Sequence, residues 1–104
     1  MTTRQEALDE IEAALAEAEI SADPDIVGTA LSRVRMRILR ITGEASGLDA
    51  TARAKRTGGD EQGAQTLERE ATALRGLLPP IQARHDVARR RLSEMTRNGE
   101  GGRV

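Results

Sequence analysis

The sequence predicts an all-α protein, a small bundle of three to four helices arranged as two antiparallel helical hairpins. In one version of this fold, oligomerisation completes the bundle. Two observations lead to this class. Apolar residues recur every three or four positions in four successive segments, which is the period of an amphipathic helix. Residues that typically begin or end helices lie between those segments. We therefore expect at least about two-thirds of the chain to be helical, with no sheet.

The first of these segments predicts a helix over residues 3–20. Thr3 and Glu6 have the spacing of a capping box, in which each side chain accepts a hydrogen bond from a backbone N–H at the start of the helix. The apolar positions form one narrow seam, made of Leu8, Ile11, Leu15 and Ala18. Because the connection over 21–24 is short, this helix and the next are expected to form an antiparallel hairpin.

The segment Asp23–Gly43 predicts the central helix of the chain. Asp23 suits the N-cap, and Pro24 suits the first helical position because its missing N–H would have no partner there. Gly43 suits the C-terminal end, since glycine adopts the left-handed conformation at little cost. One face carries Val27, Ala30, Leu31, Val34, Ile38 and Ile41, and a second apolar strip carries Met36 and Leu39. A helix that is apolar over most of its circumference is usually buried on more than one side.

The five residues 34–38 also alternate between apolar residues and arginine, which is the pattern of a short strand. The caps on both sides enclose a segment of helical length, and the wider pattern has the helical period. A helix is therefore the preferred interpretation and a strand the alternative.

Residues 44–78 allow two interpretations. In the preferred one, 44–47 is a loop, 48–57 is a weakly apolar helix, and Gly58-Gly59 is a turn. Asp60 then caps a helix whose apolar positions are Leu67, Ala71, Leu74 and Leu78. In the alternative, one long helix runs over 46–78 and tolerates glycines in its interior, of which the three at Gly58, Gly59 and Gly63 cost about 3 kcal/mol relative to alanine.

Pro79-Pro80 is expected to end or kink the preceding helix, and Pro80 suits the first position of the last one. The apolar line of that helix is Ile81, Ala88, Leu92 and Met95, and Asn98-Gly99 suits its C-cap. These expectations give a single helical domain over 1–97 and a flexible C-terminal tail over 98–104.

The composition predicts a thin hydrophobic core. The 104 residues include no Phe, Tyr or Trp, and alanine is the commonest residue. A core of small aliphatic side chains makes a monomer marginal, so burial against a partner is attractive on energetic grounds. The absence of cysteine excludes disulfides and thiolate sites, and no signal peptide or membrane-length apolar run is apparent. We expect a cytoplasmic protein without a membrane partner.

Charge is distributed unevenly along the chain. Residues 1–25 carry eight acids and one base, whereas 26–56 carry seven bases and two acids. Arginines form two basic groups, one in the central segment and one in the last predicted helix. They are Arg33, Arg37 and Arg40, and Arg89, Arg90 and Arg91. The preferred interpretation is a basic rim that pairs with acids of neighbouring helices or of a protein partner. The alternative is phosphate binding, against which stand the acidic first helix and the lack of an aromatic residue to stack on a base.

No catalytic, cofactor-binding or metal-binding constellation is apparent. His85 is the only histidine and lies on the apolar line of the last helix, so we expect a partly buried structural residue. With no second histidine and no cysteine, a metal centre lacks convergent ligands. No phosphate-binding loop or nucleophile motif is present. We therefore expect no enzymatic activity, no cofactor and no small-molecule substrate.

These observations favour a non-catalytic helical protein–protein interaction module, which self-associates or serves as a structural subunit of a larger assembly, for example a virion or a similar complex. The expected interface is the apolar surface of the central helix, made of Val27, Leu31, Val34, Met36, Ile38, Leu39 and Ile41. The alternative is an accessory or regulatory protein that binds nucleic acid through its arginines.

Overall fold

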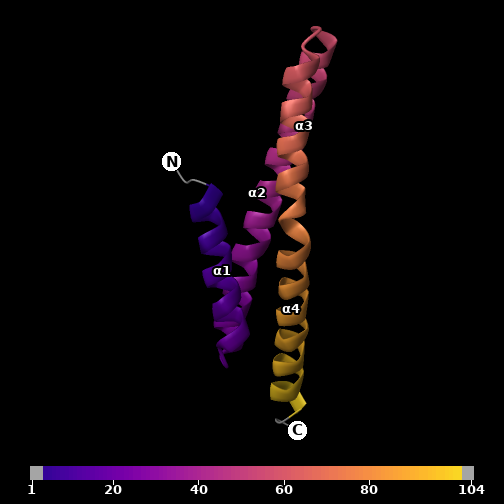
Figure 1. Cartoon of the computed structure of the whole chain (residues 1–104). Helices are drawn as coiled ribbons and strands as arrows, with labels where there is room; N and C mark the ends of the chain where they lie inside the picture. Colours follow the sequence, from indigo (N-terminus) through magenta and orange to yellow (C-terminus); the bar gives the residue numbers. More distant parts are fainter. Residues whose placement is uncertain (1–3, 102–104) are drawn as a thin grey trace. The chain divides into compact units, whose positions relative to one another are not determined.

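The computed structural model of the chain describes the backbone of residues 4–101 and the side chains of residues 4–97. The chain forms four helices: α1 (Arg4–Ile20), α2 (Pro24–Thr57), α3 (Glu61–Gly76) and α4 (Leu78–Gly101) (Figure 1). No strand occurs in residues 4–101, so the predicted all-α class is confirmed. The strand alternative for 34–38 is wrong, because these residues lie inside α2.

The start of α2 has the predicted cap. Asp23 Oδ1 accepts a hydrogen bond of 2.9 Å from the N–H of Asp25, and the Asp23 carbonyl accepts one of 3.0 Å from the N–H of Val27. Pro24 occupies the first helical position as expected. The capping box proposed at Thr3 lies outside the described residues.

The end of α2 differs from the prediction. The helix does not stop at Gly43, and the loop expected over 44–47 is wrong, because α2 continues to Thr57. The apolar positions continue at helical spacing beyond the glycine, and Ile41, Ala45 and Ala52 are buried. A helical glycine costs about 1 kcal/mol relative to alanine, which burial of this continued stripe offsets.

The predicted break at Gly58-Gly59 is confirmed. Gly59 has a φ of 89°, a left-handed conformation that glycine adopts readily. Asp60 caps α3 as predicted, since Asp60 Oδ1 accepts a hydrogen bond of 2.9 Å from the N–H of Gly63. The alternative of one long helix over 46–78 is therefore wrong.

Only Leu77 separates α3 from α4, and its N–H donates to the Leu74 carbonyl at 3.1 Å. The last helix begins at Leu78, two residues before the predicted start at Pro80. Both prolines lie in its first turn, where backbone N–H groups have no helical partner. The C-cap predicted at Asn98-Gly99 is wrong, because α4 runs to Gly101.

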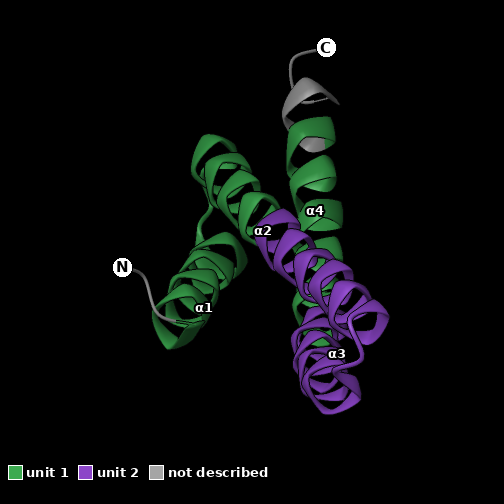
Figure 2. Cartoon of the chain, turned by 90° about the horizontal axis from the view of Figure 1, so that it is seen from above, with its two compact units in different colours: residues 1–37, 80–104 green, residues 38–79 purple. Residues whose placement is uncertain are grey.

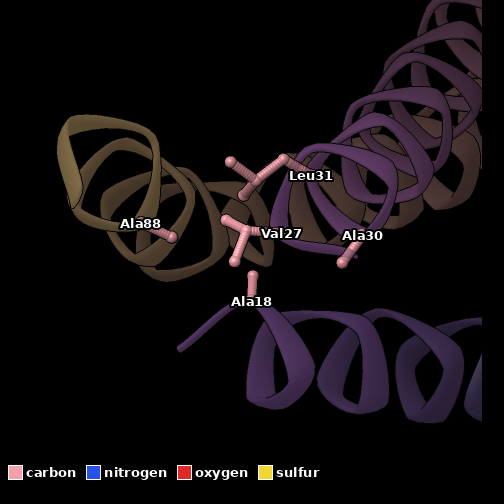
Figure 3. Packing of buried hydrophobic residues seen from close by; sticks show 5 residues of the cluster. All are labelled: Ala18, Val27, Ala30, Leu31 and Ala88. Atoms are coloured by element: carbon pink, nitrogen blue, oxygen red, sulfur yellow. The ribbon is translucent and has the colours of Figure 1, made fainter. Parts of the chain in front are cut away.

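The chain divides into two compact units, of which unit 1 comprises 1–37 with 80–104 and unit 2 comprises 38–79 (Figure 2). In unit 1, α1, the first part of α2 and α4 share one apolar cluster. It consists of Ala18, Val27, Ala30, Leu31 and Ala88, with Leu92 and Met95 packed against it (Figure 3). Three helices can meet around Val27 because their contact positions include the short side chains of Ala18, Ala30 and Ala88.

The core of unit 2 also relies on alanine. Its buried residues are Ile41, Ala45, Ala52, Ala64, Ala71, Leu74 and Leu78. Half of the buried hydrophobic residues in the described part of the chain are alanines, which agrees with the thin core that the composition predicts.

Candidate interaction surface

The seven residues of the predicted interface divide into two sets. Val27, Leu31 and Val34 are at most 2% exposed inside unit 1, Ile41 is buried in unit 2, and Ile38 is partly buried. Met36 and Leu39, in contrast, are 71% and 70% exposed. The first set therefore serves the chain's own packing, and the apolar area open to a partner on α2 comes mainly from the second.

Other exposed apolar side chains are more scattered. Ile20 is the last residue of α1, Ile26 lies in the first turn of α2, and Val87 lies on α4. Single exposed apolar residues are normal on protein surfaces. Met36 and Leu39 differ because they lie three positions apart in the middle of one helix, where such residues are neighbours. Together they are the largest exposed apolar side chains of α2 beyond its first turn.

Within unit 2, the side of α2 that carries Leu39 consists of one large and several small residues. We call it the outer face of α2 and define it as Leu39, Gly43, Ser46, Gly47 and Ala50, all of which are exposed. By helical periodicity it lies opposite the buried positions Ile41, Ala45 and Ala52. A Cβ added at Gly43 or at Gly47 would meet no atom within 4 Å, so the space above both glycines is open. Another helix could approach α2 closely here.

Two opposite charges border the outer face. Arg40 and Glu44 each follow a residue of that face by one position, at Leu39 and Gly43, and both are exposed. Neither side chain makes a hydrogen bond or an ion pair with the part of the chain that the structure describes. Although they lie four positions apart on one helix, their charges remain open to a binding partner.

Two arginines of the predicted basic rim bind groups of the chain itself. Arg37 pairs with Glu10 of α1. Arg91 donates hydrogen bonds from its two terminal nitrogens to the carbonyls of Ala18 and Ser21, at 2.7 and 2.6 Å. These carbonyls lie at the C-terminal end of α1, where backbone oxygens lack helical partners. Arg91 therefore caps α1 from another helix.

The remaining four arginines of the rim are Arg33, Arg40, Arg89 and Arg90. All four are exposed, and none makes an ion pair within residues 4–97. Their charge is therefore free for a protein acid or for a phosphate.

Arg84 and Arg56 each pair with two glutamates of another helix, and of these pairs only those of Arg56 were not anticipated from the sequence. Arg84 of α4 binds Glu12 and Glu19 of α1 at 2.5 and 2.6 Å, and this hydrogen bond lowers the pKa of Glu19. In unit 2, Arg56 binds Glu61 and Glu68 of α3 at 2.9 and 2.5 Å and lowers the pKa of both carboxyl groups. The spacing of seven between the two acids of α3 was the available signal, because it places them on one side of a helix.

His85 is 6% exposed, in line with a buried position on the apolar line of α4. Its Nδ1 lies 3.3 Å from Asp86 Oδ1, and its Nε2 has no hydrogen-bond partner within the described residues. No group of three or more His, Asp or Glu side chains that could hold a metal ion occurs in that part of the chain.

Two further findings concern membrane crossing and similarity to known proteins. Among the described helices, none combines the length and the apolar character that crossing a bilayer requires. In comparisons with known proteins, no protein-family model, no curated protein and no solved structure matches the chain.

Proposed function

We propose that this protein is a non-catalytic helical interaction module, which self-associates or docks as a structural subunit of a larger assembly. The observation that carries the proposal is the exposure of Met36 and Leu39, at 71% and 70%, in the middle of the longest helix. Transfer of one such side chain from water into a packed interface is worth about 1.5–3 kcal/mol. The surrounding residues of the outer face are small, so a partner helix could bury Leu39 without a steric obstacle.

The proposed module is a bundle of helical hairpins that a partner completes. In unit 1, Ala18 lies beside Val27 near the turn (Figure 3). Glu10 pairs with Arg37 farther from the turn. In unit 2, Arg56 beside the turn pairs with Glu61, and Asp49 farther along pairs with Arg75 at 2.5 Å. Both sets of contacts are those expected of two antiparallel helices joined by a short turn.

Affinity purification of the tagged chain from its native host tests the proposal. We expect a protein partner to co-purify with the wild-type chain and to be lost with Leu39→Glu, because a carboxylate at this position must be desolvated when the partner binds. Val87→Glu is the matched control, since it makes the same change at an exposed apolar residue of α4 and should retain the partner. Equal recovery of partners with both variants would contradict the proposal.

A second candidate function is nucleic-acid binding, which the four unpaired arginines of the rim favour. Nuclease treatment of the same purification separates the two candidates. If protein contacts dominate, recovery is unaffected by nuclease, and the purified chain binds random DNA no more tightly than about 10 µM at physiological salt. Submicromolar binding that weakens steeply with salt would favour the second candidate instead.

A further inference from the structure

The first helix is attached to the rest of unit 1 largely through charge. Arg84 of α4 binds Glu12 and Glu19 of α1, and Arg37 of α2 pairs with Glu10. In each of these ion pairs, α1 supplies the carboxylate and a neighbouring helix supplies the arginine. All three pairs therefore have the same polarity, in agreement with the excess of acids in α1.

The C-terminal turn of α1 has the wrong charge for a helix on its own. It carries two glutamates and no basic residue. Carboxylates are unfavourable there, because the free carbonyls give this end of a helix a negative charge. In the structure α4 supplies the missing positive charge, since Arg84 binds Glu19 at 2.6 Å. Arg91 adds hydrogen bonds to the carbonyls of Ala18 and Ser21. The end of α1 is thus stabilised by α4 and not by its own residues.

The apolar attachment of α1 is small. Its buried residues include only two that are larger than alanine, Ile11 and Leu15. To the apolar cluster of unit 1, α1 contributes Ala18 alone, whereas the other members of the cluster belong to α2 and α4. Contacts between α2 and α4 therefore remain when α1 is removed.

We infer that α1 is a releasable arm, which is helical while arginines of α2 and α4 hold it and which undocks and unfolds as one segment when these contacts are screened, while α2 and α4 stay paired. The inference concerns conformation and goes beyond the proposed function. Arg84 and Glu12 are 35% and 65% exposed, so dissolved salt reaches this pair. Ionic strength would then control whether Ile11 and Leu15 are covered.

Hydrogen–deuterium exchange of the full chain tests the release, because amide protection reports local opening. Raising sodium chloride from about 0.05 to about 0.5 M at constant pH shortens the Debye length to less than about 5 Å. The protection of residues 5–20 should then fall about tenfold, because several ion pairs weaken together. Residues 27–34 of α2 should change by less than about twofold. Unchanged protection of α1, or an equal loss in both segments, would overturn the inference.

Arg84→Gln should release α1 without added salt. It removes the pairs with Glu12 and Glu19, so the protection of residues 5–20 should fall about tenfold at low salt. The further effect of salt should be smaller than in the wild type, since fewer pairs remain to be screened. Arg90→Gln is the matched control on the same helix, because Arg90 is exposed and has no ion pair within residues 4–97. Equal protection of α1 in the two variants would contradict the role of Arg84.

Charge exchange at a single pair tests the same contacts with the arginine of α2. Arg37→Glu should lower the protection of residues 5–20 at low salt, because it places a second carboxylate beside Glu10. The double variant Arg37→Glu/Glu10→Arg restores opposite charges and should recover most of the loss. A double variant as weakly protected as Arg37→Glu would count against the inference. In each variant, residues 27–34 serve as the internal reference that separates release of α1 from unfolding of the whole chain.

Discussion

Arg91 Nη1 donates a hydrogen bond of 2.7 Å to the backbone carbonyl of Ala18, 73 positions earlier in the sequence. The same guanidinium also donates a hydrogen bond of 2.6 Å to the carbonyl of Ser21, the residue that follows α1. A planar fork with several donors can satisfy two acceptors at once, which a lysine ammonium at the end of a flexible chain does less well. The end of α1 thus depends on one side chain of α4.

Arg91→Ala should lower the free energy of unfolding by about 1–3 kcal/mol, since it leaves two part-buried carbonyls without a charged donor. Arg91→Lys should restore only part of this loss. Arg90→Ala, at an exposed neighbour without an ion pair, should change stability by less than about 0.5 kcal/mol. Urea unfolding followed by circular dichroism measures all three, and equal effects of the Arg90 and Arg91 variants would contradict the capping role.

Val34→Asp should unfold unit 1, because Val34 is completely buried and an unpaired carboxylate there costs several kcal/mol. Ser32→Asp places the same side chain at an exposed position of the same helix and should melt close to the wild type. Thermal melting distinguishes the two variants. If Val34→Asp kept the wild-type melting temperature, Val34 would not be part of the core of unit 1.

The free energy of unfolding should decrease at acidic pH, because arginines pair with ionised glutamates in the folded state. Arg84 lowers the pKa of Glu19, and Arg56 lowers those of Glu61 and Glu68, from an ordinary value of 4.5. A carboxyl group with a lowered folded-state pKa stabilises the fold fully above the unfolded-state value, and this contribution is lost as the pH falls through the folded-state value. These pairs should therefore make the urea midpoint decrease as the pH falls below about 4.5.

Arg84→Gln provides the control for this pH dependence. It removes the guanidinium whose hydrogen bonds and charge lower the pKa of Glu19, so its midpoint should decrease less between pH 5.5 and pH 3 than that of the wild type. An identical decrease in both proteins would show that the Arg84 contacts do not contribute to the acid sensitivity.

Gly43→Ala should raise the stability of α2 by about 0.5–1 kcal/mol, since the added methyl group enters open space in a helical position. Gly59→Ala should have the opposite sign, because the φ of 89° strains any residue with a Cβ. Thermal melting at low protein concentration compares the two substitutions. A loss of stability with Gly43→Ala in the monomer would show that some part of the chain covers this glycine.

Local signals in the sequence were sufficient for most of the fold. The caps at Asp23 and Asp60 and the turn at Gly58-Gly59 each depend on a few adjacent residues, and all three were predicted correctly. The continuation of α2 was missed because Gly43 resembled a C-terminal stop. The spacing of Ile41, Ala45 and Ala52 indicates that the helix continues beyond Gly43. This signal is weak in the sequence, because alanine is only slightly apolar.

The candidate surface was harder to predict, since sequence periodicity shows which faces of a helix are apolar and not which of them the chain covers itself. Val27 and Leu39 both belong to apolar strips of α2, yet one is completely buried and the other is 70% exposed. The partners of Arg84 and Arg91 lie 65 to 73 positions away. Pairing at that distance depends on tertiary structure, which residue spacing along a helix does not encode.

The alanines in both cores restrict how this sequence can change over evolutionary time. In a core of leucine, isoleucine and valine, substitutions can exchange volume between neighbours and leave the backbone in place. At Ala18 or Ala88, which are at most 2% exposed where helices meet, a larger side chain must displace a whole helix. We expect natural variants to differ freely along the exposed faces and to retain alanine, glycine or serine at these contact positions.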